Sequence, residues 1–138
     1  MNVTAVPFEE LQAAWHLAAP HLKEAVAMSG GRYSMRALYE TIAAQKAVLW
    51  LIVDDTGAVV AACTTHVAHY PLKDILAVDF VGGTDVGDWL ASLVETLGRF
   101  VTAQQLDGLE TVARLGWKPR LAALGWKQSM AFYERGLA

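Results

Sequence analysis

The sequence has little cysteine, little clustered charge and no long apolar run. Cys63 is the single cysteine, so a disulfide within the chain is excluded, and its place after the apolar run 59–62 favours a buried, inert thiol. The net charge is only −3, and Lys and Arg do not gather into one stretch. Nucleic acid and anionic membranes are therefore not expected as partners. The longest apolar run, 47–53, is far too short to span a bilayer.

Residues 1–4 have neither a basic region nor a long apolar segment, so we expect no signal peptide and a cytoplasmic protein. What the chain does have is apolar residues, which make up 54% of its 138 positions. No linker or low-complexity segment interrupts residues 1–138, and we predict a single domain with its own core. Five tryptophans are many for this length, so some should pack inside and others should line a groove or an interface.

Helical patterns dominate the first part of the chain, after a possible short strand at residues 2–5. Apolar residues recur at helical spacing from Phe8 to Leu22. Pro20 interrupts this run, which predicts either a kink or two consecutive helices. Ser34 is a good N-cap for the next helix.

The rest of the chain alternates between strand and helix patterns. We predict strands at 48–53, 58–69, 75–81, 108–113 and 127–133, and helices from Asp88 onward and over 117–124. The full order is α-α-β-β-β-α-β-α-β. Hairpins followed by one crossover helix predict an α/β fold with a central mixed sheet of about six strands, antiparallel first and parallel across the crossover, with helices on both faces.

A glycine-rich turn, Val81–Gly87, joins one of these strands to the helix that begins at Asp88. At such a place unpaired N–H groups and the positive end of the helix dipole can hold phosphates. Neighbouring parallel strands part beside a crossover and leave a crevice. We therefore place any ligand between the strands 75–81 and 108–113.

Four segments carry a family resemblance: Leu49–Val53, Thr64–Thr65, Val81–Gly83 and Arg114–Leu121. Together with the order of elements, they resemble the GNAT superfamily of acyl-CoA N-acyltransferases, and within it the small GNAT-like proteins of bacteriophages and prophages. The resemblance implies a single GNAT-like domain that uses acetyl-CoA, or a longer acyl-CoA, as its donor. It also implies an amine acceptor on a small molecule or a protein, and a homodimer or a phage virion as the assembled form.

The cofactor loop of this family has Gln or Arg, two residues, Gly, one residue and then Gly or Ala. Only Gly87 fits that pattern, because Thr84 replaces the first residue and Trp89 replaces the last. Asp85 and Asp88 add negative charge where a pyrophosphate would lie, which opposes its binding.

Transfer of an acyl group to an amine needs a base, because an ammonium does not attack a carbonyl. Asp79, a polar residue within an apolar strand, is the first candidate and Glu110 is the second. Each of them could instead face solvent or pair with an arginine. The tyrosine that serves this family as general acid is replaced by Leu121, so Tyr70 or Tyr133 would act only if the fold brought it near.

Other residues are candidates for binding the donor. In an acyltransferase, the N–H groups of Val86, Gly87 and Asp88 would hold the pyrophosphate. Amides near Phe80 and Val81 would polarise the thioester carbonyl as an oxyanion site.

A basic cluster surrounds one tryptophan. Arg114, Lys118 and Arg120 flank Trp117, so they could hold a phosphate or an acidic partner while the indole stacks on adenine. A solvated face beside a packed tryptophan is the alternative. His66 and His69 lie three apart and so on opposite faces of a strand, and no metal site is expected. One of the two could serve as a base or line the acceptor pocket.

Two functions remain open at this point. The first is an N-acyltransferase, which the retained Gly87 and the glycine-rich turn favour. The second is a catalytically inactive GNAT-like fold that acts as a phage-associated structural or interaction module through Trp and Arg contacts, which the altered loop and Leu121 favour.

Overall fold

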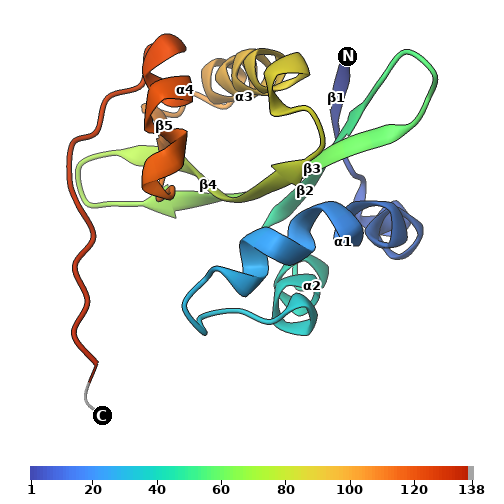
Figure 1. Cartoon of the computed structure of the whole chain (residues 1–138), viewed down its shortest axis with the longest axis horizontal. Coiled ribbons are helices and arrows are strands. Elements are labelled where there is room, and N and C mark those ends of the chain that lie inside the picture. Colours follow the sequence, from blue (N-terminus) through green and yellow to red (C-terminus); the bar gives the residue numbers. More distant parts are fainter. Residues whose placement is uncertain (137–138) are drawn as a thin grey trace.

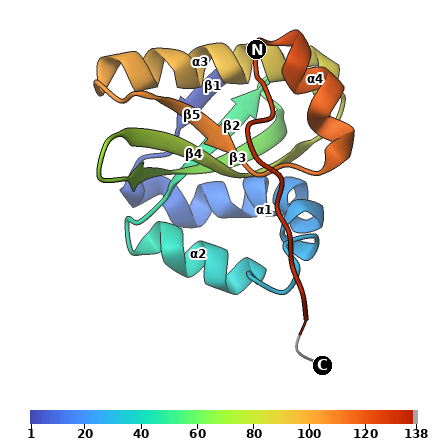
Figure 2. The same ribbon diagram turned by 90° about the vertical axis from the view of Figure 1, so that its left-hand side faces the viewer.

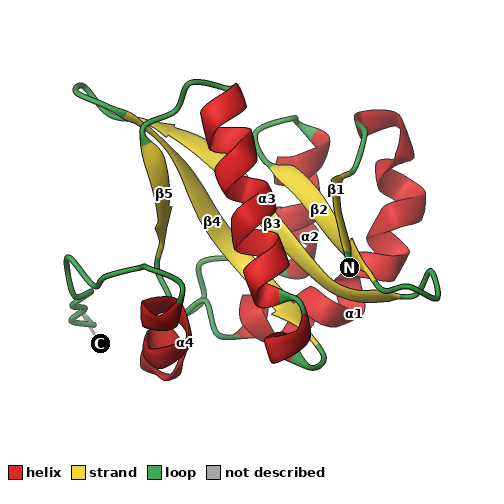
Figure 3. Cartoon of the chain, turned by 90° about the horizontal axis from the view of Figure 1, so that it is seen from above, coloured by secondary structure: helices red, strands yellow, loops and turns green. Residues whose placement is uncertain are grey.

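The structure is a computed structural model that describes residues 1–136. Five strands form one sheet in the order β1-β2-β3-β4-β5 (Figure 1, Figure 3). Their bounds are β1 Asn2–Ala5, β2 Val48–Val53, β3 Val59–His69, β4 Asp74–Gly83 and β5 Gly108–Thr111. The first four strands pair antiparallel in sequence order, whereas β4 and β5 run parallel. The predicted mixed sheet is confirmed, with five strands in place of about six.

Helices cover both faces of the sheet (Figure 2). The first two lie on one face and the last two on the other. Their bounds are α1 Leu11–Ala27, α2 Met35–Ala43, α3 Leu90–Ala103 and α4 Lys118–Ala123, with short 3-10 turns η1 Phe8–Glu10, η2 Val86–Asp88 and η3 Leu115–Trp117. Since α3 joins β4 to β5, it is the crossover that a parallel pair requires.

The first long helix is continuous despite its proline. Pro20 lies inside α1, so of the two alternatives for this run the division into two helices is wrong. Pro20 and His16 are both exposed, and water can therefore reach the His16 carbonyl that loses its N–H partner. Ser34 caps α2 as predicted, because its hydroxyl accepts a hydrogen bond from the Ala37 N–H at 3.0 Å.

The sheet separates two hydrophobic clusters. The cluster beneath α1 and α2 includes Leu22 and Leu38, and the cluster beneath α3 includes Trp89 and Leu93. Cys63 is fully buried in the second cluster, and this burial raises the pKa of its thiol. Because the thiolate is the reactive form and burial disfavours it, the environment of Cys63 agrees with the predicted inert thiol.

The predicted strand at 127–133 is wrong. Residues 127–136 follow α4 as a tail with neither helix nor strand. Figure 2 shows the tail passing from the α4 side of the sheet to the α1 side. The segment has the composition of a strand, but no neighbouring strand supplies hydrogen bonds, and strand propensity alone does not form one. Within residues 1–136, no helix combines the length and the apolar character that crossing a membrane requires.

Candidate functional site

The strands β4 and β5 part where the sequence predicted a crevice. They pair from Ile75 and Gly108 as far as Val78 and Thr111, and β4 then continues alone to Gly83. At the last pair the Thr111 hydroxyl donates a hydrogen bond to the Val78 carbonyl at 2.8 Å. Beyond it opens a cleft of about 410 Å³.

The cleft has walls from both layers of helices. One wall is the apolar face of α3 with the segment after β5 and α4, and the other comes from the end of α1 and the loop that follows it. Trp117 and Trp126 line the cleft, so part of the tryptophan set does line a groove as predicted. Trp89 does not plug the opening, because it is fully buried and its indole N–H donates to the Thr84 carbonyl at 2.7 Å.

A β-bulge explains the polar residue in the apolar strand β4. The register between β3 and β4 steps from Thr65 opposite Val78 to Thr64 opposite Phe80, which leaves Asp79 as an extra residue. A bulge bends its strand and redirects the side chain of the extra residue. Asp79 consequently lies at the cleft instead of in the core.

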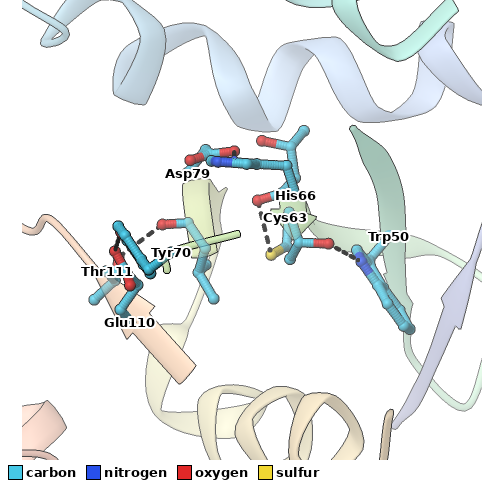
Figure 4. A network of polar contacts seen from close by, with 10 residues as sticks. Trp50, Cys63, His66, Tyr70, Asp79, Glu110 and Thr111 are labelled. Atoms are coloured by element: carbon cyan, nitrogen blue, oxygen red, sulfur yellow. Dashed lines mark hydrogen bonds and ion pairs between the residues drawn. The ribbon is translucent and has the colours of Figure 1, made fainter. Parts of the chain in front are cut away.

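Asp79 is hydrogen-bonded to a histidine from the neighbouring strand. The distance between His66 Nδ1 and Asp79 Oδ2 is 2.6 Å (Figure 4). Their side chains are 41% and 31% exposed, so both groups are partly shielded yet accessible. Burial raises the pKa of the Asp79 carboxyl above its ordinary value; His66 opposes this rise and the charge of Glu110 adds to it.

A second pair lies on the other side of a smaller cavity. The Tyr70 hydroxyl donates to Glu110 Oε2 at 2.8 Å, and this bond raises the pKa of Tyr70 (Figure 4). His66, Tyr70, Asp79 and Glu110 together line this cavity of about 240 Å³, which shares wall residues with the cleft. The fold thus brings together the two carboxylates that the sequence singled out.

Sequence spacing had left His66 and Tyr70 as unconnected options. The hairpin register pairs His66 with Ala77, so Asp79 is the diagonal neighbour of His66. The contact between His66 and Asp79 depends on the bulge, which cannot be seen in the sequence. Tyr70 lies near Glu110, whereas Tyr133 is 90% exposed on the tail and lines neither cavity.

The glycine-rich turn begins later than predicted. Gly82 and Gly83 are the last residues of β4 and pair with β3. A Cβ on Gly82 would collide with the His21 carbonyl of α1, and a Cβ on Gly83 would collide with Ala61 of β3. These two glycines therefore allow close packing of backbones and are not part of a phosphate loop.

The turn proper runs through Asp85, which has a left-handed backbone with φ of 54°, into η2. The N–H of Asp88 donates to the Asp85 carbonyl at 2.8 Å, so this one of the three predicted donors is already engaged. The N–H groups of Val86 and Gly87 lie at the start of the short turn and have no partner within it.

An arginine from α4 approaches this turn. Arg120 Nη1 lies 3.9 Å from the position that a Cβ on Gly87 would occupy. Its guanidinium is exposed, and no carboxylate in residues 1–136 forms an ion pair with it. A free positive charge thus stands beside the turn and opposes the charges of Asp85 and Asp88.

The other members of the basic cluster differ in position. Arg114 lines the cleft with Trp117, whereas Lys118 is exposed and lines neither cavity. His69 bonds to Asp74 at 2.7 Å, away from both cavities. Among residues 1–136, no group of three His, Cys, Asp or Glu side chains is placed to hold a metal ion.

No model of a known protein family matches the sequence, and no curated protein matches it. Solved structures do match. A probable acetyltransferase aligns with 100% of this chain and 97% of its own at a TM-score of 0.73 and 11% identity. An aminoglycoside acetyltransferase from an uncultured soil metagenomic sample, in complex with sisomicin, aligns with 99% of this chain and 96% of its own at a TM-score of 0.72 and 10% identity.

A third structure, a predicted acetyltransferase from Clostridium acetobutylicum with acetyl-CoA, covers 99% of this chain and 96% of its own at a TM-score of 0.68 and 10% identity. Identities this low establish the fold alone. The chain has the fold of the GNAT acetyltransferases.

Proposed function

We propose that the protein is an N-acyltransferase that moves an acyl group from acetyl-CoA, or a longer acyl-CoA, to an amine. One observation carries this proposal: the cleft between the parted strands reaches Leu90, two residues after Asp88 of the turn that Arg120 approaches, and it shares Asp79 with the smaller cavity of acid–base groups. Residues 84–88 and Arg120 themselves line neither cavity, so a donor at the turn would extend beyond the cleft. An anionic donor and an amine acceptor need these two environments. The match to acetyltransferase structures, one of which contains acetyl-CoA, supports it.

The donor's pyrophosphate would lie at the turn between β4 and α3. There it would accept hydrogen bonds from the N–H groups of Val86 and Gly87 and pair with the Arg120 guanidinium. This arginine, which comes from another part of the chain, takes over the role of the basic residue that Thr84 replaces. Trp117 would stack on the adenine, since a tryptophan at the cleft offers a flat apolar surface.

The thioester carbonyl would lie beside Phe80 and Val81. Both residues line the cleft on the part of β4 that extends past its last pairing with β5. Backbone N–H groups that face this free edge have no β5 carbonyl as acceptor. They are therefore available to stabilise the oxyanion that forms when the amine attacks.

The proton of the acceptor amine would leave at the Asp79 side of the smaller cavity. Asp79 lies at the bulge and lines both cavities, whereas Glu110 already accepts a hydrogen bond from Tyr70. Asp79 is therefore the better placed of the two carboxylates predicted from the sequence. The acceptor itself is an amine of a small molecule or a protein.

Calorimetric titration with acetyl-CoA and with CoA tests the donor site. We expect binding that stabilises the protein by about 2.7 kcal/mol at about 100 times the dissociation constant. Arg120→Ala should weaken binding by about tenfold or more, because it removes a charged hydrogen-bond donor. Arg36→Ala is the matched control, since Arg36 pairs with Glu40 on α2, which covers the face of the sheet opposite α3 and α4 (Figure 2). No heat at millimolar ligand would contradict the proposal.

A second candidate function is the inactive interaction module, linked to phages by the sequence resemblance alone. The exposed apolar side chains Met130, Phe132 and Tyr133 on the tail favour it, since such residues anchor protein interfaces. It predicts self-association, or assembly into a larger particle, by a protein that does not bind acetyl-CoA. Analytical ultracentrifugation measures the oligomeric state. A protein that sediments strictly as a monomer and binds acetyl-CoA in the calorimetric titration would contradict this candidate.

A further inference from the structure

We propose that Nε2 of His66 takes the proton from the acceptor amine, and that Asp79 is the positioning residue that holds the imidazole for this task. The inference rests on the acyltransferase function proposed above. It replaces a lone carboxylate base with a histidine–aspartate dyad that spans the neighbouring strands β3 and β4.

The hydrogen bond fixes which ring nitrogen is free. An ionised carboxylate only accepts hydrogen bonds, so the 2.6 Å contact with Asp79 requires the proton of neutral His66 to be on Nδ1. The lone pair is then on Nε2. The His66 side chain lines the 240 Å³ cavity, so a small amine that enters the cavity can contact the imidazole ring that carries this lone pair.

Basicity also favours the imidazole over the carboxylate. A general base works best when it titrates near the working pH, and an imidazole ordinarily does so whereas a carboxylate is a much weaker base. The carboxylate contributes in another way, because its negative charge stabilises the imidazolium that forms beside it. Asp79 therefore acts through His66.

The remaining charged group at the cavity does not compete for this role. Glu110 on β5 accepts the hydrogen bond of Tyr70, which comes from the loop between β3 and β4. The groups that face His66 across the cavity are thus Asp79, Glu110 and Tyr70. The negative charge of Glu110 would attract the ammonium form of the acceptor before it loses its proton.

The proton transfers balance as follows. His66 Nε2 takes one proton from the ammonium and releases it to solvent, and the neutral amine nitrogen then bonds to the thioester carbon. The nitrogen of the tetrahedral intermediate passes its second proton to His66. The carbon–sulfur bond breaks as the carbonyl re-forms, and the departing thiolate takes that proton from His66. The products are the amide, the CoA thiol and one proton in solution.

The chain contains a matched control for this dyad. His69 and Asp74 form the same kind of pair at 2.7 Å, between the same two strands, but His69 does not line the cavity. The variants are therefore His66→Gln and Asp79→Asn at the dyad and His69→Gln at the control pair.

The first measurement needs no substrate. Long-range ¹H–¹⁵N correlation spectra of the imidazoles should show neutral His66 with its proton on Nδ1. In Asp79→Asn the population with the proton on Nε2 should rise. A His66 ring that carries its proton on Nε2 in the unaltered protein overturns the proposal.

The second measurement follows thiol release with a primary amine as acceptor. His66→Gln should lower kcat/KM by about a hundredfold or more, and remove the limb of the pH profile that coincides with the His66 titration seen by NMR. Asp79→Asn should lower kcat while acetyl-CoA affinity stays unchanged, and His69→Gln should behave like the unaltered protein.

The outcomes separate the two proposals. Normal kcat/KM in His66→Gln overturns the role of His66 and leaves the acyltransferase standing. Absence of acetyl-CoA binding by the unaltered protein overturns the acyltransferase and, with it, this role.

Discussion

Asp79 is the residue at which stability and the proposed chemistry oppose each other. Burial is the main cause of its raised pKa, so folding favours the protonated carboxyl. The stability that this protonated form contributes is present below the unfolded pKa and is lost as the pH rises through the folded value. At neutral pH the ionised Asp79 therefore costs stability, which is typical of groups held in place for function.

Asp79→Asn should accordingly raise the free energy of unfolding at about pH 7.5, because the amide keeps the shape and can still accept from His66 without a buried charge. The gain should shrink as the pH falls through the raised pKa of Asp79, because the carboxyl of the unaltered protein then becomes protonated. Urea unfolding at a series of pH values measures both effects.

Asp54 provides the control with the opposite sign. Hydrogen bonds from Thr56 and Ala58 lower the pKa of Asp54, so its contribution to stability is present above the unfolded pKa and lost in acid. Asp54→Asn should therefore lose stability at neutral pH. If Asp79→Asn loses stability there as well, the assignment of burial as the dominant effect at Asp79 is wrong.

At the scale of elements, close approach of α1 to β4 depends on one glycine. Gly82 faces the His21 carbonyl of the helix, where a Cβ has no room. Gly82→Ala should destabilise the protein by about 1–3 kcal/mol, because the helix must move away from the sheet. Thermal and urea unfolding measure the loss.

The same substitution inside α3 should have the opposite effect. A Cβ on Gly98 would meet nothing within 4 Å, and its backbone is helical. Gly98→Ala should stabilise the protein by about 0.5–1 kcal/mol, since alanine restricts the unfolded chain more than glycine does. Equal losses at both positions would contradict the packing argument.

Most elements could be predicted from the sequence because their apolar patterns are long and their order is simple. The strands β2 to β4, the crossover helix and the crevice beside it all depend on topology, which element order determines. The bulge at Asp79 could not be predicted, because it is a shift in strand register and no residue type in the sequence indicates it. The sequence predicts a turn at Gly82 and Gly83 because glycine permits turns as well as close packing. Only the positions of α1 and β3 show that close packing is the reason for these two glycines.

The whole molecule consists of two hydrophobic clusters that share one sheet, and the candidate site lies where the sheet stops being continuous. The short β5 leaves the end of β4 unpaired, and the cleft extends from the α3 side around this edge to the loop after α1. A site at this place contacts both layers. A ligand bound there would therefore connect the helices on one face of the sheet with those on the other.

The tail provides another connection between the layers. Arg32, in the loop between α1 and α2, pairs with Glu134 at 3.2 Å, and its guanidinium lies 5.0 Å from the centroid of the Phe132 ring. Both tail residues line the cleft. Arg32 thus holds the tail, which follows α4, against the loop after α1 at the wall of the cleft.

Arg32→Ala should release the tail without unfolding the domain. Exposed ion pairs and cation–π contacts each contribute about 1 kcal/mol or less, so the melting temperature should change little. Chymotrypsin cleavage after Phe132 or Tyr133, followed by mass spectrometry, should become several times faster, because the released segment can enter the protease. Arg36→Ala removes a more exposed arginine, one that pairs with Glu40 on α2, and should leave the cleavage rate unchanged. Equal rates in the two variants would mean that Arg32 does not hold the tail, and the cleft would then be open on that side.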